Sequence, residues 1–227
     1  MFLSRVPLNL ARAGTRKFLS SPQVSHAAVL AAFPPERLTG PSDGSGRVLW
    51  RIDRRDTDID LYVVSPHEPD FTHVVEQAGW PTTTAWATRK YTPLLDSLTE
   101  GQQWHFRLTA NPIRSAMDRT LDGHLTRGKP TGLTAGDQMT WLETKAGNNG
   151  FRLGICRSPQ GDIPDATITQ RSTLRFRRGS ADITLSTATY EGILVVTDTQ
   201  KLRAALINGI GRAKGYGCGL LTLAPVA

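Results

Sequence analysis

The sequence predicts an α+β fold made of two tandem ferredoxin-like (RRM-like) domains. The expected elements follow the order β-α-β-β-α in the first half of the chain, and a similar order recurs in the second half. Between the halves, residues 79–93 are rich in Pro, Thr and Trp and lack a clear period. A chain of 227 residues can form one large core or two small ones, and the repeated order favours domains at residues 1–90 and 91–227.

The first domain is expected to begin with a strand over residues 2–8, because residues 1–9 alternate between apolar and polar side chains. A helix, two strands, a second helix and a closing strand follow, at residues 24–33, 47–52, 59–64, 71–78 and within 79–93. The first 35 residues contain no acid, which is also typical of organellar transit peptides. The strand-like alternation favours keeping them in the mature fold.

The second domain is expected to begin with a strand over residues 104–110 and a helix over residues 135–146, ended by Asn148, Asn149 and Gly150. Four strands, a helix and a last strand follow, at residues 151–155, 168–177, 183–189, 193–196, 199–208 and 220–223. This order is again that of a ferredoxin-like domain, with one additional hairpin.

The composition is typical of a globular protein that folds in water, with 39% hydrophobic and 21% charged residues. No apolar run approaches the roughly 18 residues of a membrane-spanning helix, so we expect no membrane association. The net charge of +7 favours a polyanionic partner, although solubility alone explains the total equally well. The position of the charges must therefore decide between these explanations.

One basic cluster falls on an expected hairpin. No acid occurs between Asp165 and Asp182, and this interval contains Arg171, Arg175, Arg177 and Arg178. Leu174 and Phe176 alternate with two of these arginines, so a strand would bury the apolar pair and expose the cations. A ribbon of this kind can bind phosphates, and it can equally be an edge strand that charges protect from aggregation.

A second cluster is the glycine-rich loop, which we define as residues 209–219. Gly209, Gly211 and Gly215 are among its five glycines, and Arg212 and Lys214 supply positive charge. Free backbone N–H groups in such a loop can approach phosphate closely. The loop follows a helix and precedes a strand, unlike a dinucleotide fingerprint, and it lacks the Ser or Thr of a P-loop. An ordinary glycine-rich connection fits the spacing as well.

His26 is the histidine that we single out, because it lies on the first expected helix with Gln23 one turn before it and Arg16 and Lys17 upstream. Histidine titrates near neutrality and can transfer protons during phosphodiester cleavage. A lone histidine is also an ordinary surface or core residue.

The sequence contains no recognisable metal-binding pattern. The histidines lack metal-ligand spacing, and no carboxylate cluster suggests two-metal catalysis, so neither a metal nor another cofactor is expected. Cys156 and Cys218 are far apart and outside any C-x-x-C pair, and we interpret both as small buried residues in a reducing cytoplasm.

Several segments, taken together and in order, resemble the CasE-type CRISPR repeat endoribonucleases of type I-E systems. They are MFLSRV at residues 1–6, FRLTANP at 106–112, WL at 141–142 before FR at 151–152, YEGIL at 190–194, GIGRAK at 209–214 and GCGLLTLAP at 217–225. The resemblance covers nearly the whole chain, and its C-terminal block is the most specific part.

The resemblance implies two ferredoxin-like domains that bind the hairpin of a CRISPR repeat and cut at its 3′ base to give mature crRNA. The protein would remain on the product as one subunit of Cascade in the prokaryotic cytoplasm, and would be a monomer when free. The family's catalytic histidine falls on His26, its basic hairpin on residues 171–178, and its glycine-rich loop on residues 209–219. Arg127 and Lys129 lie where other members of the family also carry basic residues.

One departure from the family concerns Gln23, because well-known members carry a tyrosine three residues before the histidine. Glutamine cannot exchange a proton, so water or another side chain would have to serve as the second proton-transfer group.

The expected reaction is metal-independent transesterification giving a 2′,3′-cyclic phosphate and a 5′-hydroxyl, with Arg212 or Lys214 stabilising the phosphorane. The alternatives are a repeat-binding Cascade subunit with weak or no catalysis and a ferredoxin-like ligand sensor.

Overall fold

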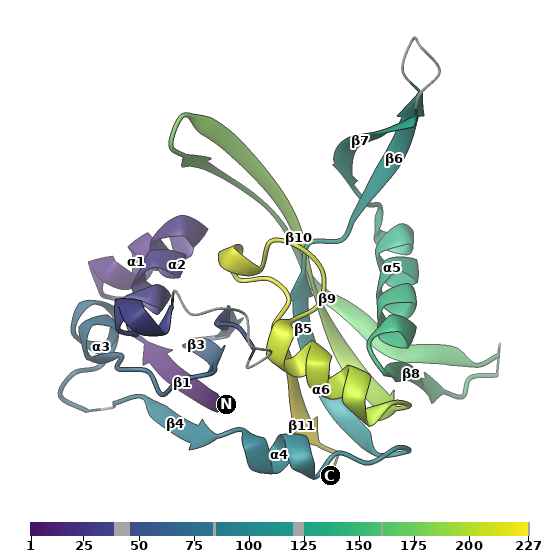
Figure 1. The fold of residues 1–227 in the computed structure, drawn as a ribbon, viewed down its shortest axis with the longest axis horizontal. Helices are drawn as coiled ribbons and strands as arrows, with labels where there is room; N and C mark the ends of the chain where they lie inside the picture. Colours follow the sequence, from purple (N-terminus) through teal and green to yellow (C-terminus); the bar gives the residue numbers. More distant parts are fainter. Residues whose placement is uncertain (39–45, 84, 120–124, 160, 227) are drawn as a thin grey trace.

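The computed structural model describes residues 1–38, 46–83, 85–119, 125–159 and 161–226, with backbone alone for residues 115–119, 125–131 and 178. Figure 1 shows two sheets with their helices side by side, the first domain at the left and the second at the right. Both domains have the predicted ferredoxin-like arrangement. The glycine-rich loop, drawn in yellow, lies between them.

The first domain is a four-stranded antiparallel sheet in the order β2-β3-β1-β4. Its strands are β1 (Phe2–Leu8), β2 (Leu49–Arg55), β3 (Asp58–Ser65) and β4 (Ala87–Lys90). The predicted strand over residues 2–8 is confirmed, and it pairs with both β3 and β4. Val6, Leu61 and Val63 point from the sheet into a core that is closed by Val29 and Phe71 of the helical side.

The first helical segment differs from the prediction, because the single helix expected over residues 24–33 is preceded by another. The helices of this domain are α1 (Ala13–Ser20), α2 (Pro22–Leu30) and α3 (Thr72–Ala78). Ser21 separates α1 from α2, and its hydroxyl caps α2 by accepting a hydrogen bond from Val24 N at 3.4 Å. Pro22 lacks the N–H that a continuous helix would need and occupies the first turn of α2.

The second domain repeats the strand order, as β11-β5-β10-β8, with β9 paired to both β8 and β10. Its elements are β5 (Gln103–Ala110), α5 (Ala135–Asn148), β8 (Phe151–Cys156), β9 (Ile163–Arg178), β10 (Ala181–Val196), α6 (Thr199–Asn208) and β11 (Leu221–Pro225). The additional hairpin that the sequence predicts is therefore formed by the long strands β9 and β10. A short helix α4 (Thr92–Asp96) connects the domains.

Two details of the second domain were not predicted. The strands expected over residues 183–189 and 193–196 are one strand, because a register shift at Thr189/Tyr190 lets the pairing continue through Gly192. A Cβ at Gly192 would lie 2.1 Å from Asp165 O, so glycine is what permits the close pairing. The hairpin of β6 (Ile113–Arg119) and β7 (Leu125–Gly132) was also missed.

The two cysteines have different environments. Cys218 is buried, as predicted, and burial raises the pKa of its thiol to about 12. Cys156 is exposed, so the prediction of a buried residue is wrong there. It is the last residue of β8, where the strand leaves the sheet, and alternation at a strand end does not determine burial. Among the described residues, no helix is long and apolar enough to cross a membrane.

Candidate functional site

His26 lies half-buried on α2. Contacts with α1 and α3 hold this helix in place. Ser25 Oγ donates to Phe18 O at 2.9 Å, fixing α2 to the end of α1. His73 Nε2 lies 2.9 Å from Ala28 O, the distance of a hydrogen bond from α3 to α2. The helix that carries His26 is thus anchored by its neighbours on the sheet.

The imidazole of His26 faces the glycine-rich loop of the other domain. A Cβ built on Gly215 would lie 3.5 Å from both Nε2 and Cε1 of His26. Gly215 belongs to η2 (Lys214–Tyr216), a single 3₁₀ turn that contacts both α2 and β2. The fold therefore brings together two residues from opposite ends of the chain, which the sequence had indicated separately.

The glycine-rich loop is closed at its base by backbone hydrogen bonds. Ile210 N donates to Gly219 O at 2.9 Å, and Gly219 N donates to Thr109 O of β5 at 2.7 Å. Gly217 has φ +81° and lies so close to Trp50 that a Cβ there would come 2.9 Å from the indole ring. The glycines of the loop therefore let the backbone take left-handed turns against β2, while the base of the loop stays hydrogen-bonded to the sheet.

The two cations of the loop differ in burial. Arg212 is exposed, whereas Lys214 is half-buried directly before Gly215. Burial, and then the positive charge of Arg47, lower the pKa of Lys214. A partly desolvated ammonium directly before Gly215 is suited to binding an anionic group, because its charge is less screened there than in bulk water.

The basic hairpin stands next to this loop. Arg171, Arg175 and Arg177 are exposed, and Leu174 and Phe176 are half-buried. The Phe176 ring meets the Tyr216 ring edge to face at 4.9 Å, which joins the hairpin to η2. Arg177 pairs with Asp182 at 3.6 Å, but both side chains are mostly exposed, so this pair contributes little to stability.

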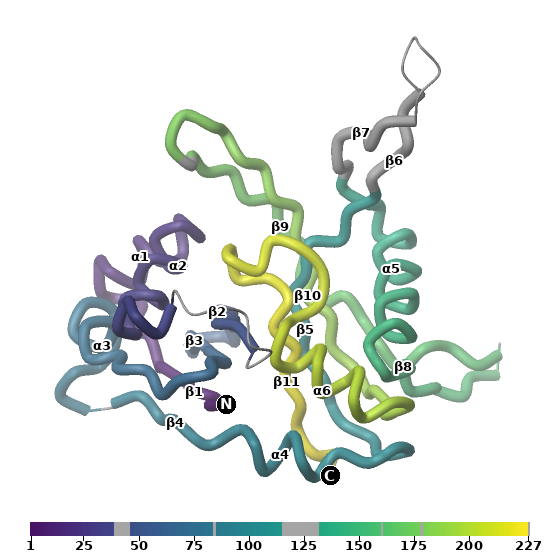
Figure 2. Tube along the Cα trace, viewed as in Figure 1, coloured from purple at the N-terminus to yellow at the C-terminus, as the bar shows by residue number. Residues whose placement is uncertain are grey.

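The remaining predicted residues lie at different distances from this centre. Arg16 and Lys17 are exposed on α1, and Gln23 is exposed one turn before His26 on α2. The backbone of Arg178 pairs with Ala181 beside the turn, but its side chain lies outside the described residues. The side chains of Arg127 and Lys129 are likewise undescribed. Their strand, β7, lies on the far side of the molecule from α2 in Figure 1, whereas the glycine-rich loop, in yellow, points toward α2 in Figure 2.

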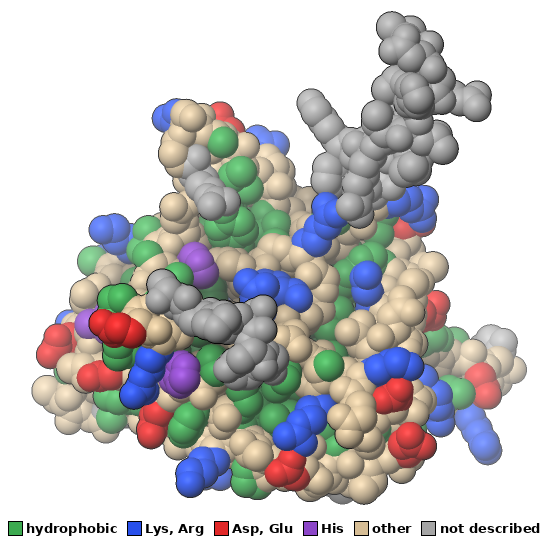
Figure 3. All heavy atoms as spheres, viewed as in Figure 1, with side chains coloured by type: hydrophobic (Ala, Val, Ile, Leu, Met, Phe, Trp, Pro, Cys, Tyr) green, Lys and Arg blue, Asp and Glu red, His purple; other side chains and the backbone are tan. Residues whose placement is uncertain are grey.

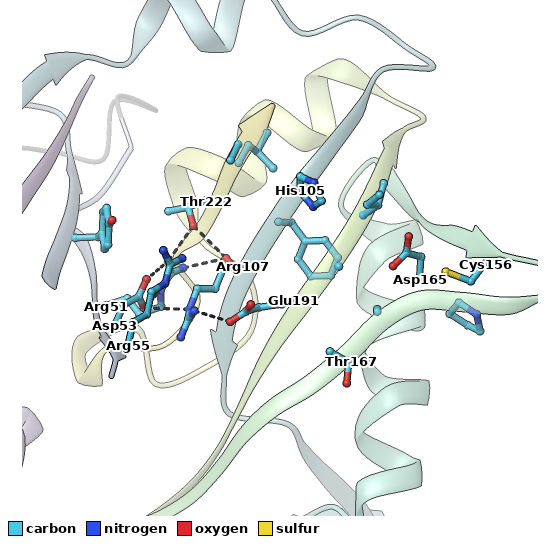
Figure 4. A pocket seen from close by; sticks show the side chains of 18 of the residues that line it. Arg51, Asp53, Arg55, His105, Arg107, Cys156, Asp165, Thr167, Glu191 and Thr222 are labelled. Carbon is cyan, nitrogen blue, oxygen red and sulfur yellow. Dashed lines mark hydrogen bonds and ion pairs between the residues drawn. The ribbon is translucent and has the colours of Figure 1, made fainter. Parts of the chain in front are cut away.

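A large cleft lies away from His26. It encloses about 800 Å³ between the faces of the two sheets that no helix covers, and its lining includes Arg51, Asp53, Arg107 and Glu191 (Figure 4). A smaller hollow of about 190 Å³ is lined by Pro22 and Ser25 of α2, Trp50, Tyr216 and the shaft of the β9–β10 hairpin. Neither Trp50 nor Tyr216 was predicted as a site residue, because isolated aromatic residues in a strand or loop are most often packing residues.

Figure 3 shows basic side chains near the middle of the face on which the β9–β10 hairpin projects. Within the parts of the chain that the structure describes, no three His, Cys, Asp or Glu side chains cluster in a way that could hold a metal ion.

A model of the family described as CRISPR associated protein matches residues 1–225. The CRISPR system Cascade subunit CasE of Escherichia coli K12 is 29% identical over 232 residues, covering 100% of both chains. The CRISPR-associated endoribonuclease Cse3 of Thermus thermophilus is 28% identical, covering 99% of this chain and 100% of its own length. The solved structure of Thermus thermophilus Cse3 bound to an RNA representing a pre-cleavage complex is similar, with a TM-score of 0.74, 29% identity and coverage of 99% and 98%.

Proposed function

This chain belongs to the CRISPR associated protein family, and we propose that it is an endoribonuclease that matures CRISPR RNA. It binds the hairpin of the CRISPR repeat, cuts at the 3′ base of that hairpin, and stays on the product as a Cascade subunit in the prokaryotic cytoplasm. The names of its relatives, a Cascade subunit and an endoribonuclease, support this proposal. The observation that carries it is the contact between the His26 imidazole and Gly215 of the glycine-rich loop.

The chemistry we propose is an internal transesterification. The ribose 2′-hydroxyl attacks the adjacent phosphorus, the bond to the 5′-oxygen breaks, and the products end in a 2′,3′-cyclic phosphate and a 5′-hydroxyl. One proton leaves the 2′-hydroxyl and one reaches the 5′-oxygen, and His26 performs one of these transfers. Lys214 lies beside Gly215, where an ammonium can stabilise the charge that builds on the phosphorane. These groups accomplish the step without a metal ion.

Recognition of the RNA relies on phosphates and on shape. Exposed arginines of the β9–β10 hairpin can bind phosphates of an A-form stem, whose deep major groove hides the base edges. The contact of Phe176 with Tyr216 connects this hairpin to the loop that faces His26. Binding of the stem by the hairpin therefore helps to position the loop for cleavage. Arg16 and Lys17 extend the basic surface on α1.

A second candidate function is a repeat-binding Cascade subunit with weak or absent catalysis. Gln23 favours it, because this exposed amide stands one helical turn from His26 and cannot give or take a proton. All of the binding residues would keep their roles, and only the rate of cleavage would differ.

The experiment that separates these functions is incubation of the protein with its own labelled CRISPR repeat in EDTA. The proposed function predicts a cut RNA with a 2′,3′-cyclic phosphate and a 5′-hydroxyl. Binding without a product would support the second candidate, and an RNA that is neither bound nor cut would contradict both. A need for added Mg²⁺ or Mn²⁺ in the chemical step, after RNA folding is controlled for, would contradict the mechanism.

A further inference from the structure

Arg51, on β2 of the first domain, is a buried arginine that the proposed mechanism does not use. Its side chain is 2% exposed, and it is the largest of the fully buried side chains among the described residues. The guanidinium donates to both carboxylate oxygens of Asp53, at 2.6 and 2.9 Å. It also donates to Arg107 O and Thr222 Oγ1, both at 2.9 Å (Figure 4), and to Leu220 O at 2.8 Å.

These bonds use all five N–H donors of the guanidinium, and three of the five cross from the first domain to the second. Asp53 extends the connection, since its Oδ1 lies 3.3 Å from Arg107 Nε of β5. Burying an ion pair is a poor way to gain stability, because desolvation offsets much of the attraction. The geometry of the guanidinium is more informative. A planar group that binds five fixed acceptors allows only one orientation of one domain relative to the other.

The residues around Arg51 show which part of the second domain is oriented. Leu49 touches Gly209, where a Cβ would lie 2.9 Å from Leu49 Cδ2. Trp50 touches Gly217, where a Cβ would lie equally close to the indole ring. Arg51 then binds the carbonyl of Leu220, directly after the loop. Three consecutive residues of β2 thus contact the start of the glycine-rich loop, its later part and the residue that follows it.

We propose that Arg51 is a positioning residue for RNA cleavage. Its bonds to Leu220 O, Arg107 O and Thr222 Oγ1 fix the glycine-rich loop to the first domain, so that Gly215 and Lys214 stand at the His26 imidazole. Arg51 touches neither His26 nor the RNA in this proposal, and it acts through the loop. The inference rests on the proposed function, since it concerns the rate of that same reaction.

The test compares replacements of Arg51 with a matched arginine on the same face of the same sheet. Arg5 and Arg51 both lie opposite Tyr62 in the strand register, but Arg5 is 54% exposed and pairs with Asp60 at 2.8 Å inside the first domain. Arg51→Lys keeps the charge but cannot reach all five acceptors at once. Arg51→Met keeps the apolar stem, and Arg5→Met is the control for loss of one arginine from this face.

Three quantities are measured for each variant: the single-turnover cleavage rate at saturating protein, the Kd for a repeat with 2′-deoxyribose at the cut site, and the thermal unfolding midpoint. We expect both Arg51 variants to lose at least tenfold in rate, toward the ~10²-fold that misplacement by about 1 Å can cause, while the Kd changes by only a few-fold. Arg5→Met should cut at nearly the parental rate. A purely structural role would lower the unfolding midpoint and leave the rate of the folded fraction unchanged.

Thr222→Val provides a milder variant if either Arg51 variant fails to fold, because it removes one acceptor of the guanidinium and preserves side-chain volume. We expect a smaller loss of rate with unchanged Kd. Rates equal to that of Arg5→Met, in folded Arg51 or Thr222 variants, would overturn the inference while leaving the proposed function intact. An unaltered chain that does not cut its repeat would instead overturn the proposed function, and this inference with it.

Discussion

The two ferredoxin-like domains have the same strand order, but they differ in the connections that leave the sheet. In the first domain, the connection after β1 holds α1 and α2 and therefore His26, whereas the corresponding connection of the second domain holds the β6–β7 hairpin and α5. In the connection before the last strand, it is the second domain that carries the candidate site residues. The second domain has the glycine-rich loop there, and the first has residues 79–86 leading into the short strand β4.

The difference indicates a division of labour between the domains. In the proposed mechanism, the first domain supplies a proton-transfer group, and the second supplies cations and backbone N–H groups that can bind phosphate. Gly215 at His26 and the bonds of Arg51 to the second domain connect the two contributions. Changes at His26 should therefore alter the cleavage rate. Changes to the second domain should alter the rate when they lie in the glycine-rich loop and the affinity when they lie in the basic hairpin.

The largest effect is expected from a change in the RNA. A repeat with 2′-deoxyribose at the cut site lacks the internal nucleophile, so cleavage should be abolished. Both domains keep their contacts with the rest of the RNA, and the affinity should remain close to that for the unmodified repeat. Single-turnover cleavage and a binding titration measure the two quantities, and normal cutting of the deoxy repeat would show that the nucleophile is misassigned.

Within the glycine-rich loop, the two cations should differ. Lys214→Met removes the half-buried ammonium beside Gly215 and should lower the cleavage rate by on the order of 10². Arg212→Met removes an exposed guanidinium from the same loop and should lower the rate much less. Rates measured at saturating protein decide the matter. Equal effects of the two variants would mean that burial does not distinguish their roles.

The basic hairpin should contribute affinity and its salt dependence. Replacing Arg175 and Arg177 by Ala removes two exposed cations, so fewer counterions are released on binding and the slope of log K against log salt should flatten by roughly one to two units. A matched variant lacking Arg89 and Lys90, two exposed cations of β4, should keep the parental slope. If both variants flatten the slope alike, only total charge matters and the hairpin does not bind the RNA.

The smallest effect is expected from Gln23→Tyr. A hydroxyl at this exposed position lies one helical turn from His26 on the same face of α2 and could reach the scissile phosphate. We expect the cleavage rate to stay the same or to rise, with no change in affinity. A fall in rate would indicate that Gln23 itself takes part in the reaction, and Gln23→Ala distinguishes that role from crowding by the larger ring.

The sequence was sufficient for the repeated architecture, because strand alternation and helix signals depend on neighbouring residues. It also contained the signal for the break before α2, since Ser21 and Pro22 form an N-cap and first-turn pair that was not used. The contact of His26 with Gly215 could not be derived in this way, because it depends on the orientation of two domains. Arg51 was missed for a related reason, since an arginine in a strand is normally expected at the surface.

The central claim is that one histidine of the first domain performs chemistry on RNA held by the second. The most direct test compares the unaltered protein with His26→Ala, in EDTA, on the labelled repeat at saturating protein. We expect His26→Ala to cut ~10² to 10⁴ times more slowly, because a single proton-transfer group contributes about that much, while its affinity for the repeat changes by no more than a few-fold. Parental cleavage by His26→Ala, or a loss of cleavage fully explained by lost affinity, would contradict the account.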